Sequence, residues 1–149
     1  MATQLECGFC NPPEKYQKFY IRDYGYWRVA LHESQVYLGR CIIPLKRHLE
    51  DQSLVTPEEW MEMLQITRDL WGVTKELFGT GRFNLSTLGN EINHTHFHFI
   101  PRYEKKVVFE GITFRDDNWG KNYTPYNRGL LVPEEIQLKI RDAIKSELA

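Results

Sequence analysis

Three histidines lie at alternate positions within five residues of the sequence: His94, His96 and His98. If this segment is a β-strand, the three side chains share one face, because residues i, i+2 and i+4 of a strand point the same way. At about 3.3 Å per residue, the row is roughly 13 Å long, which is comparable with a short polyphosphate. The intervening Phe97 and Phe99 would then lie on the opposite face, where they can pack on a core.

The neutral imidazole ring has chemistry that suits this arrangement. Its unperturbed pKa is about 6.5, so much of it is neutral and nucleophilic near pH 7. Histidine can attack an acyl or phosphoryl centre to form a covalent intermediate, and a neighbouring imidazole can donate hydrogen bonds to phosphate oxygens as charge develops. The pattern therefore indicates a catalytic face. A face that only binds metal and a chance cluster of histidines are the alternatives.

Two of the three cysteines form a Cys-x-x-Cys pair at Cys7 and Cys10. An odd number of cysteines with this spacing suits a metal site in a reducing compartment better than a disulfide framework. The third, Cys41, has apolar neighbours in an expected strand and is predicted to lie in the core.

The composition is that of an ordinary globular domain, with 42% apolar and 26% charged residues in a chain of 149. The net charge is −1, so no excess of lysine and arginine points to nucleic acid or an anionic membrane as a partner. No apolar run reaches the roughly 18 residues of a membrane span, and residues 1–10 lack the basic start and apolar stretch of a secretory signal. We expect a single-domain cytoplasmic protein.

Strand patterns occur at four places in the chain, namely residues 27–31, 40–44, 83–86 and 93–100. Pro101 follows the last of them. Because proline cannot donate a ladder hydrogen bond, we expect it to end that strand.

A long helix is predicted between the second and third strands. Thr56, Pro57 and Glu59 provide an N-cap, a proline at the first helical position and the acidic partner of a capping box, and Gly79 provides a stop. An apolar stripe follows at three- and four-residue steps, and its members are Trp60, Met63, Leu64, Thr67, Leu70, Trp71, Thr74, Leu77 and Phe78. We interpret this stripe as the face that packs on a sheet.

A second helix is predicted over residues 133–148, with Ile136, Ile140, Ala143 and Ile144 on one side. Strands that follow one another along the chain with long helices between them favour an α+β domain. The fold expected is an antiparallel sheet with the long helix packed on it.

The aromatic and charged segment 103–128 has three interpretations. Its cations and tryptophan can complement phosphate and stack on a base, which would make it a lid, and those residues are Lys105, Lys106, Arg115, Trp119 and Lys121. Structural cover for the sheet edge and a dimer contact are the alternatives.

The sequence NHTHFHFIPR at residues 93–102 resembles the motif of the histidine triad (HIT) family of nucleotide hydrolases and transferases. The sequence GRCIIPLKRH at 39–48 is similar to the family's Gly-His strand and its Pro-Lys-x-His turn. The resemblance covers residues 5–105, which leaves 106–149 as a C-terminal extension with its helix. From Leu88 to Arg102 the chain looks most like diadenosine tetraphosphate hydrolases.

The resemblance implies roles for individual residues. His96 would be the nucleophile, with its other ring nitrogen held by a backbone carbonyl, here that of His94. His98 would donate to the scissile phosphate, Asn90 would contact phosphate, and His32 would contact the nucleotide at its ribose. His32 has an equally weighted alternative as an ordinary surface residue at a strand end.

The sequence departs from the family pattern at two places. Arg40 stands where many relatives have histidine, so any orienting role of that histidine is lost or is taken by a cation. The loop before the triad, residues 88–90, lacks the usual Gly-Gln step.

The resemblance also implies a metal site and an assembly. Some relatives bind zinc through two N-terminal cysteines, the turn histidine and the first triad histidine, which correspond here to Cys7, Cys10, His48 and His94. Four protein ligands close a zinc site, so this zinc would be structural. The alternative is a pair of unliganded cysteines. Family members commonly form homodimers, and we expect the same here.

The leading functional interpretation is hydrolysis of a dinucleoside polyphosphate through a nucleotidyl intermediate on His96. Within the same class, the alternatives are a nucleoside phosphoramidate hydrolase, with an amine as leaving group, and a nucleotidyl transferase. The triad does not distinguish them, because it contacts only the α-phosphate. In a different class, Arg40 in place of histidine suits a zinc-stabilised nucleotide-binding module without turnover.

Overall fold

The computed structural model describes residues 5–148, and its centre is a five-stranded antiparallel sheet with the strand order β1-β2-β3-β5-β4. The strands are β1 (Tyr20–Asp23), β2 (Arg28–Leu31), β3 (Cys41–Pro44), β4 (Arg82–Ser86) and β5 (His96–Arg102). The helices are α1 (Glu14–Gln17), the 3₁₀ turn η1 (Gln52–Leu54), α2 (Pro57–Phe78) and α3 (Glu134–Leu148). A separate hairpin is made of β6 (Val107–Phe109) and β7 (Ile112–Phe114).

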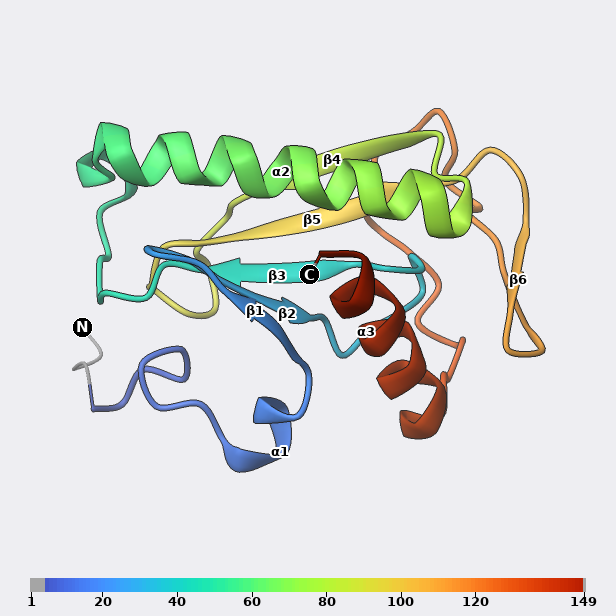
Figure 1. Ribbon diagram of the computed structural model, residues 1–149, viewed down its shortest axis with the longest axis horizontal. Helices are drawn as coiled ribbons and strands as arrows, with labels where there is room; N and C mark the ends of the chain where they lie inside the picture. Colours follow the sequence, from blue (N-terminus) through green and yellow to red (C-terminus); the bar gives the residue numbers. More distant parts are fainter. Residues whose placement is uncertain (1–4, 149) are drawn as a thin grey trace.

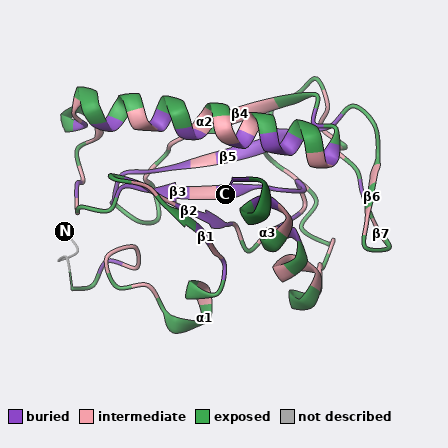
Figure 2. Cartoon of the chain, in the orientation of Figure 1, coloured by how far each residue is buried: buried purple, intermediate pink, exposed green. Residues whose placement is uncertain are grey.

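The α+β fold class predicted from the sequence is confirmed. Helix α2 runs along the sheet beside β4 and β5, and α3 contacts α2, β1 and β2 (Figure 1). Buried residues follow the central strands and the inward sides of both helices (Figure 2). Phe97, Phe99 and Cys41 lie in this core, as expected. None of the helices described is long and apolar enough to cross a membrane.

Helix α2 begins and ends as its sequence predicts. The Thr56 side chain accepts a hydrogen bond from the Glu59 amide while the Glu59 carboxylate accepts one from the Thr56 amide, so the capping box is complete. Gly79 ends the helix with a φ of 69°, in the left-handed region that glycine adopts without a Cβ clash.

The predicted apolar stripe of α2 is confirmed in part, since Met63, Leu70, Thr74 and Phe78 are buried. Trp60 and Leu64 are each 44% exposed, whereas Ile66 and Val73 are buried. The full set of buried α2 residues is Glu59, Met63, Ile66, Leu70, Val73, Thr74 and Phe78. Apolar side chains occur on both sides of this set, so helical spacing alone does not define which part of the wide stripe contacts the sheet.

The strand of the histidines, β5, differs from the prediction at both ends. It begins at His96 and not at Asn93, because β3 ends at Pro44 and the chain that faces Thr95 is already a loop, whose Leu49 carbonyl accepts from the Thr95 amide. It also continues through Pro101 to Arg102. Strand β3 pairs with β5 only as far as Phe99, so the missing N–H of Pro101 costs no ladder bond on that side.

Candidate functional site

Two cavities meet at the face of β5 that carries His96 and His98. The first has a volume of about 820 Å³ and the second about 640 Å³, and His32, His96 and His98 line both of them. His94 lines neither cavity, so the prediction that all three triad side chains line one open face is wrong. The reason is that His94 precedes the strand and its ring is buried elsewhere.

The His96 ring is oriented by the backbone of its own segment. Its Nδ1 lies 2.6 Å from the backbone oxygen of His94, the acceptor expected from the sequence analysis. A carbonyl only accepts, so Nδ1 carries the proton and Nε2 carries the lone pair. No residue between 5 and 148 bonds Nε2. In its neutral form the ring therefore has a free lone pair on Nε2, and His96 lines both cavities.

His98 has the opposite tautomer because of Arg40. The Arg40 Nη2 lies 3.2 Å from His98 Nδ1, and a guanidinium can only donate, so Nδ1 accepts and Nε2 carries the proton. Burial, followed by the Arg40 charge, lowers the pKa of His98 to about 4. His98 is therefore a neutral donor at neutral pH.

His32 lies beside His98, with the two ring centroids 5.4 Å apart. Its Nδ1 accepts from the Ser34 amide at 3.0 Å. Burial lowers the pKa of His32 to about 3, and the Arg40 charge contributes in the same direction. The structure places this residue in the wall of both cavities rather than at a plain strand end.

Asn90 lies at the rim of the larger cavity, exposed, with Leu88 and Gly89 before it. Two residues that the sequence analysis did not select support the site from behind. Thr87 Oγ1 donates to the His96 carbonyl at 2.7 Å, and the Gln35 side chain donates to the Arg40 carbonyl at 2.9 Å. Neither has a motif that would have identified it, because each acts on backbone atoms brought close only by the fold.

The C-terminal segment reaches the cavity through residues other than those predicted for a lid. The lining residues are Tyr123, Thr124, Tyr126 and Arg128. None of the predicted contacts, Lys105, Lys106, Arg115, Trp119 and Lys121, lines either cavity. The Trp119 ring instead lies against the guanidinium of Arg82, the first residue of β4, with 4.9 Å between the ring centroid and the guanidinium carbon. The spacing of residues along the sequence does not predict which side chains of an irregular segment face a cavity.

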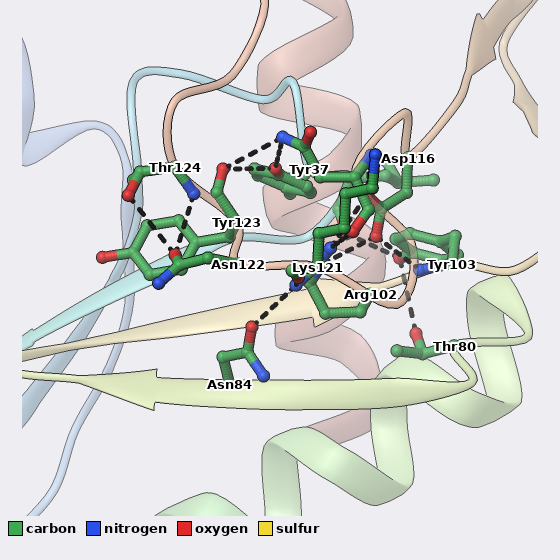
Figure 3. Close-up of polar contacts among 12 residues, drawn as sticks. Tyr37, Thr80, Asn84, Arg102, Tyr103, Asp116, Lys121, Asn122, Tyr123 and Thr124 are labelled. Atoms are coloured by element: carbon green, nitrogen blue, oxygen red, sulfur yellow. Dashed lines mark hydrogen bonds and ion pairs between the residues drawn. The ribbon is translucent and has the colours of Figure 1, made fainter.

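A buried ion pair fixes this segment to the sheet. Arg102 Nε lies 2.6 Å from Asp116 Oδ2, and the two side chains are 5% and 0% exposed. Arg102 also donates to Asn84 Oδ1 and to the carbonyls of Asn118 and Lys121. Figure 3 shows this network between β4, β5 and the segment that carries Tyr123.

A second cluster brings together Cys7, Cys10, His48 and His94, whose ligand atoms all lie within 4.8 Å of one another. The two histidine Nδ1 atoms are 3.2 Å apart. Cys10 Sγ lies 3.3 Å from His48 Nδ1 and 3.6 Å from His94 Nδ1, and Cys7 Sγ lies 3.3 Å from His94 Nδ1. Zinc ligands arranged as a tetrahedron are roughly 3.3–3.8 Å apart, so this set fits a metal ion.

The tautomers of the two cluster histidines support the same conclusion. His94 Nε2 lies 2.7 Å from the Leu45 carbonyl, and His48 Nε2 lies 3.3 Å from the Glu50 carboxylate. Both Nε2 atoms therefore donate outward, and both Nδ1 lone pairs point at each other inside the cluster. A cation between them removes that repulsion, with Leu45 and Glu50 as the outer partners that orient metal-bound histidines.

The cluster and the candidate nucleophile are joined by Phe9, which lies between the two cysteines in the sequence. Its ring centroid is 4.7 Å from that of His96 and 5.4 Å from that of His94. A metal bound by Cys7 and Cys10 would therefore hold an aromatic side chain against the His96 ring.

The fold and site define an antiparallel α+β protein in which two histidine rings of β5, one bonded to a backbone carbonyl and the other to an arginine, line a cavity beside a Cys/His cluster. The family model of the HIT domain matches residues 14–105. The chain belongs to the HIT domain family.

Solved structures of the family share the fold. A histidine triad protein from Sinorhizobium meliloti 1021 is 20% identical, with a TM-score of 0.70 and coverage of 91% of this chain and 94% of that one. A histidine triad protein from Marinobacter aquaeolei VT8 is 18% identical, with a TM-score of 0.70 and coverage of 92% and 94%. A hypothetical histidine triad nucleotide-binding protein from Sulfolobus tokodaii strain 7 is 15% identical, with a TM-score of 0.67 and coverage of 87% and 83%. No curated protein matches the chain.

Proposed function

We propose that this protein is a nucleotide hydrolase that attacks the α-phosphate of a dinucleoside polyphosphate of the diadenosine tetraphosphate type. The observation that carries the proposal is the His96 ring, whose Nδ1 donates to the His94 carbonyl while Nε2 has no partner among the described residues. The likeness of residues 88–102 to diadenosine tetraphosphate hydrolases supports this branch of the family.

The proposed reaction has two displacements. In the first, His96 Nε2 forms a bond to the α-phosphorus as the bond from phosphorus to the leaving phosphate oxygen breaks, and the leaving group departs with that electron pair. In the second, water attacks the same phosphorus as the bond to His96 breaks. The electron pair of that bond returns to Nε2, the water loses a proton to solvent, and a nucleoside monophosphate leaves. His98 Nε2–H donates to a non-bridging oxygen as charge develops on it.

Two further residues have binding roles in this proposal. Asn90 at the cavity rim donates its side-chain amide to phosphate, and His32 contacts the ribose of the nucleotide. The Sulfolobus relative is described as a nucleotide-binding protein, and a nucleotide is the same class of ligand.

The Cys/His cluster is proposed to hold structural zinc. Two thiolates and two imidazoles are zinc ligands, and they close the coordination shell, so no position remains to activate water. The metal ties residues 7–10 to the segment that leads into β5. Its contribution is to the position of the backbone and of Phe9.

A homodimer is proposed as well. Helix α2 exposes Trp60, Met61 and Leu64, and the neighbouring edge strand β4 exposes Leu85. Apolar side chains next to an unpaired strand edge favour association with a second copy. Sedimentation equilibrium is expected to give twice the chain mass, and a monomer at micromolar concentration would overturn this assignment.

The decisive experiment traps the intermediate. Protein mixed with diadenosine tetraphosphate and quenched in base is expected to carry one adenylyl group on His96 by mass spectrometry. His96→Ala is expected to form no adduct and to lose turnover while its affinity stays within about tenfold, because the other contacts remain. Cys41→Ala, a core change outside both cavities, serves as the control. Tight binding with neither adduct nor product from pH 6 to 8 would identify a binding module instead.

A substrate panel separates this proposal from its alternatives within the family. Adenosine 5′-phosphoramidate shares the adenylyl group but has an amine leaving group. A phosphate compound added to compete with water as the acceptor detects transfer of the adenylyl group. Faster turnover of the phosphoramidate, or a transferred product, would reassign the activity.

A further inference from the structure

Arg40 is a buried cation whose hydrogen-bonding capacity is only partly used. Only 5% of the surface of this residue is exposed to solvent. Nη2 donates to His98 Nδ1 and Nη1 donates to the Tyr126 hydroxyl at 3.1 Å, whereas the buried Nε has no partner. A guanidinium has five N–H groups, so these two contacts leave several donors unused.

Among the described residues, no carboxylate forms an ion pair with this guanidinium. Within residues 5–148, the ion pairs at 4.0 Å or less do not include Arg40. Three acidic residues line the same cavity: Glu134 pairs with Lys18, Glu33 accepts from the Tyr16 hydroxyl, and Glu91 is exposed at the cavity wall and forms no ion pair with Arg40. An unpaired charge is unfavourable in the protein interior because it loses its hydration, and proteins normally compensate this loss with a counter-charge.

The rings that lie next to Arg40 are uncharged, and none of the cavity's three carboxylates forms an ion pair with it. His98 and His32 are held neutral, and Arg128 lines the same cavity. The rings of Tyr123 and Tyr126 lie 5.8 Å and 5.5 Å from the guanidinium carbon. These surroundings favour an anion as the missing partner.

The part of the cavity wall that contacts Arg40, residues 123–128, is held by hydrogen bonds. Tyr37 donates from its hydroxyl to the Tyr123 carbonyl at 2.5 Å, and the Asn118 amide donates to the Pro125 carbonyl at 2.9 Å. The Arg102 network holds the start of the same segment (Figure 3). Residues 123–128 lie outside the part of the chain that matches the family, so this wall is a feature of the extension.

From these observations we infer that Arg40, together with the 123–128 wall, is a second anion site that binds the phosphate chain of the leaving group. This inference rests on the proposed function. Arg40 lines only the larger cavity, and the other cavity has the more apolar neighbours Phe9, Ile42 and Ile92. With phosphorus at His96, where the cavities meet, the anionic leaving group extends toward Arg40. A planar guanidinium suits phosphate oxygens.

A binding experiment tests the site without any turnover. Calorimetry with inorganic tripolyphosphate is expected to give about tenfold weaker binding for Arg40→Gln than for the wild type, since one charge-assisted contact is lost. Arg115→Gln removes the same charge from an exposed position outside both cavities and is expected to bind as the wild type does. If tripolyphosphate binds equally weakly to both variants, the decrease in affinity comes from the net charge alone, and the proposed anion site is wrong.

Folding is checked in the same series. Arg40→Lys keeps a cation and is expected to retain part of the affinity for tripolyphosphate, even if Arg40→Gln unfolds. Tyr126→Phe removes only the hydroxyl that accepts from Arg40 Nη1. Wild-type affinity in both Arg40 variants, each shown to be folded by circular dichroism, would overturn the inference.

Kinetics then assign the anion to the leaving group. Arg40→Gln is expected to lower kcat/KM for adenosine 5′-phosphoramidate through His98, and to lower that for diadenosine tetraphosphate about tenfold further. An equal decrease for both substrates would assign Arg40 to His98 alone. If the wild type cleaves neither substrate, the proposed function fails, and the tripolyphosphate result decides the anion site by itself.

Discussion

The Nδ1 atom of His96 lies 2.6 Å from the backbone oxygen of His94, two residues earlier in the same segment. Because the acceptor is backbone, this contact depends on the path of the chain and not on another side chain. Thr87 secures that path by donating to the His96 carbonyl. His98, the next histidine on this face, is set the other way by Arg40. Neighbouring rings therefore present one lone pair and one N–H.

This arrangement predicts a spectroscopic result. At pH 7, ¹⁵N-edited NMR of the imidazoles is expected to show His96 as the Nδ1–H tautomer and His98 as the Nε2–H tautomer. Arg40→Met removes the donor to His98 Nδ1, so His98 is expected to populate both tautomers while His96 stays unchanged. A wild-type His98 protonated at Nδ1 would contradict the assignment.

The regular elements of the fold were predictable because their signals are local. The ends of α2 follow from Thr56, Glu59 and Gly79, which act within one turn of the helix. The ends of β5 were not predictable, because they depend on where β3 stops pairing. Strand β1 was missed for a related reason: its four residues have only one buried side chain, so no alternating pattern marks them.

The site shows the same division. The positions of His96 and His98 on one face follow from strand periodicity, and the sequence also selected the four residues of the metal cluster. The contact between Arg40 and Tyr126 spans 86 residues and involves an irregular segment. No local pattern could have predicted it, because the segment is positioned by the buried Arg102 and Asp116 pair.

Stability is expected to depend on the protonation of His32. Burial, Arg40, His98 and Arg128 lower its pKa to about 3 in the folded protein, against about 6.5 in the unfolded chain. Between these values the unfolded state takes up a proton that the folded state does not, so stability falls as pH falls below 6.5, by roughly 1.4 kcal/mol per pH unit.

The matched variant is His32→Asn, whose side-chain oxygen can still accept from the Ser34 amide. In urea unfolding at pH 7 and pH 5, the wild type is expected to lose about 2 kcal/mol more than this variant. The same loss in both proteins would mean that His32 is not desolvated in solution.

Metal removal is expected to act on stability and on the site together. The purified protein should contain one zinc per chain by elemental analysis, and Cys10→Ser should contain less, whereas Cys41→Ala should keep it. Chelation is expected to lower the Tm by about 5 °C, which corresponds to roughly 1–2 kcal/mol in a domain of this size. Turnover should fall too, since Phe9 loses its anchor beside His96. An unchanged Tm after complete removal would exclude a structural role.

Asp116 provides the test of how the extension is held. Its carboxylate is fully buried against Arg102, so Asp116→Asn leaves an uncompensated buried cation and is expected to cost about 3–5 kcal/mol in urea unfolding. Glu110→Gln breaks the exposed pair with Lys139 and is expected to cost under about 1 kcal/mol.

The Asp116 variant also links stability to the cavity. Arg102 donates to the carbonyls of Asn118 and Lys121, which precede the 123–128 wall. Loss of the Asp116 charge is therefore expected to weaken tripolyphosphate binding even where the variant remains folded. If Asp116→Asn costs no more than Glu110→Gln and binds tripolyphosphate normally, the neutral acceptors around Arg102 suffice to hold the segment. In that case the charge of Asp116 contributes neither to the fold nor to the position of the wall, and the anion site would depend on the Tyr37 and Asn118 contacts instead.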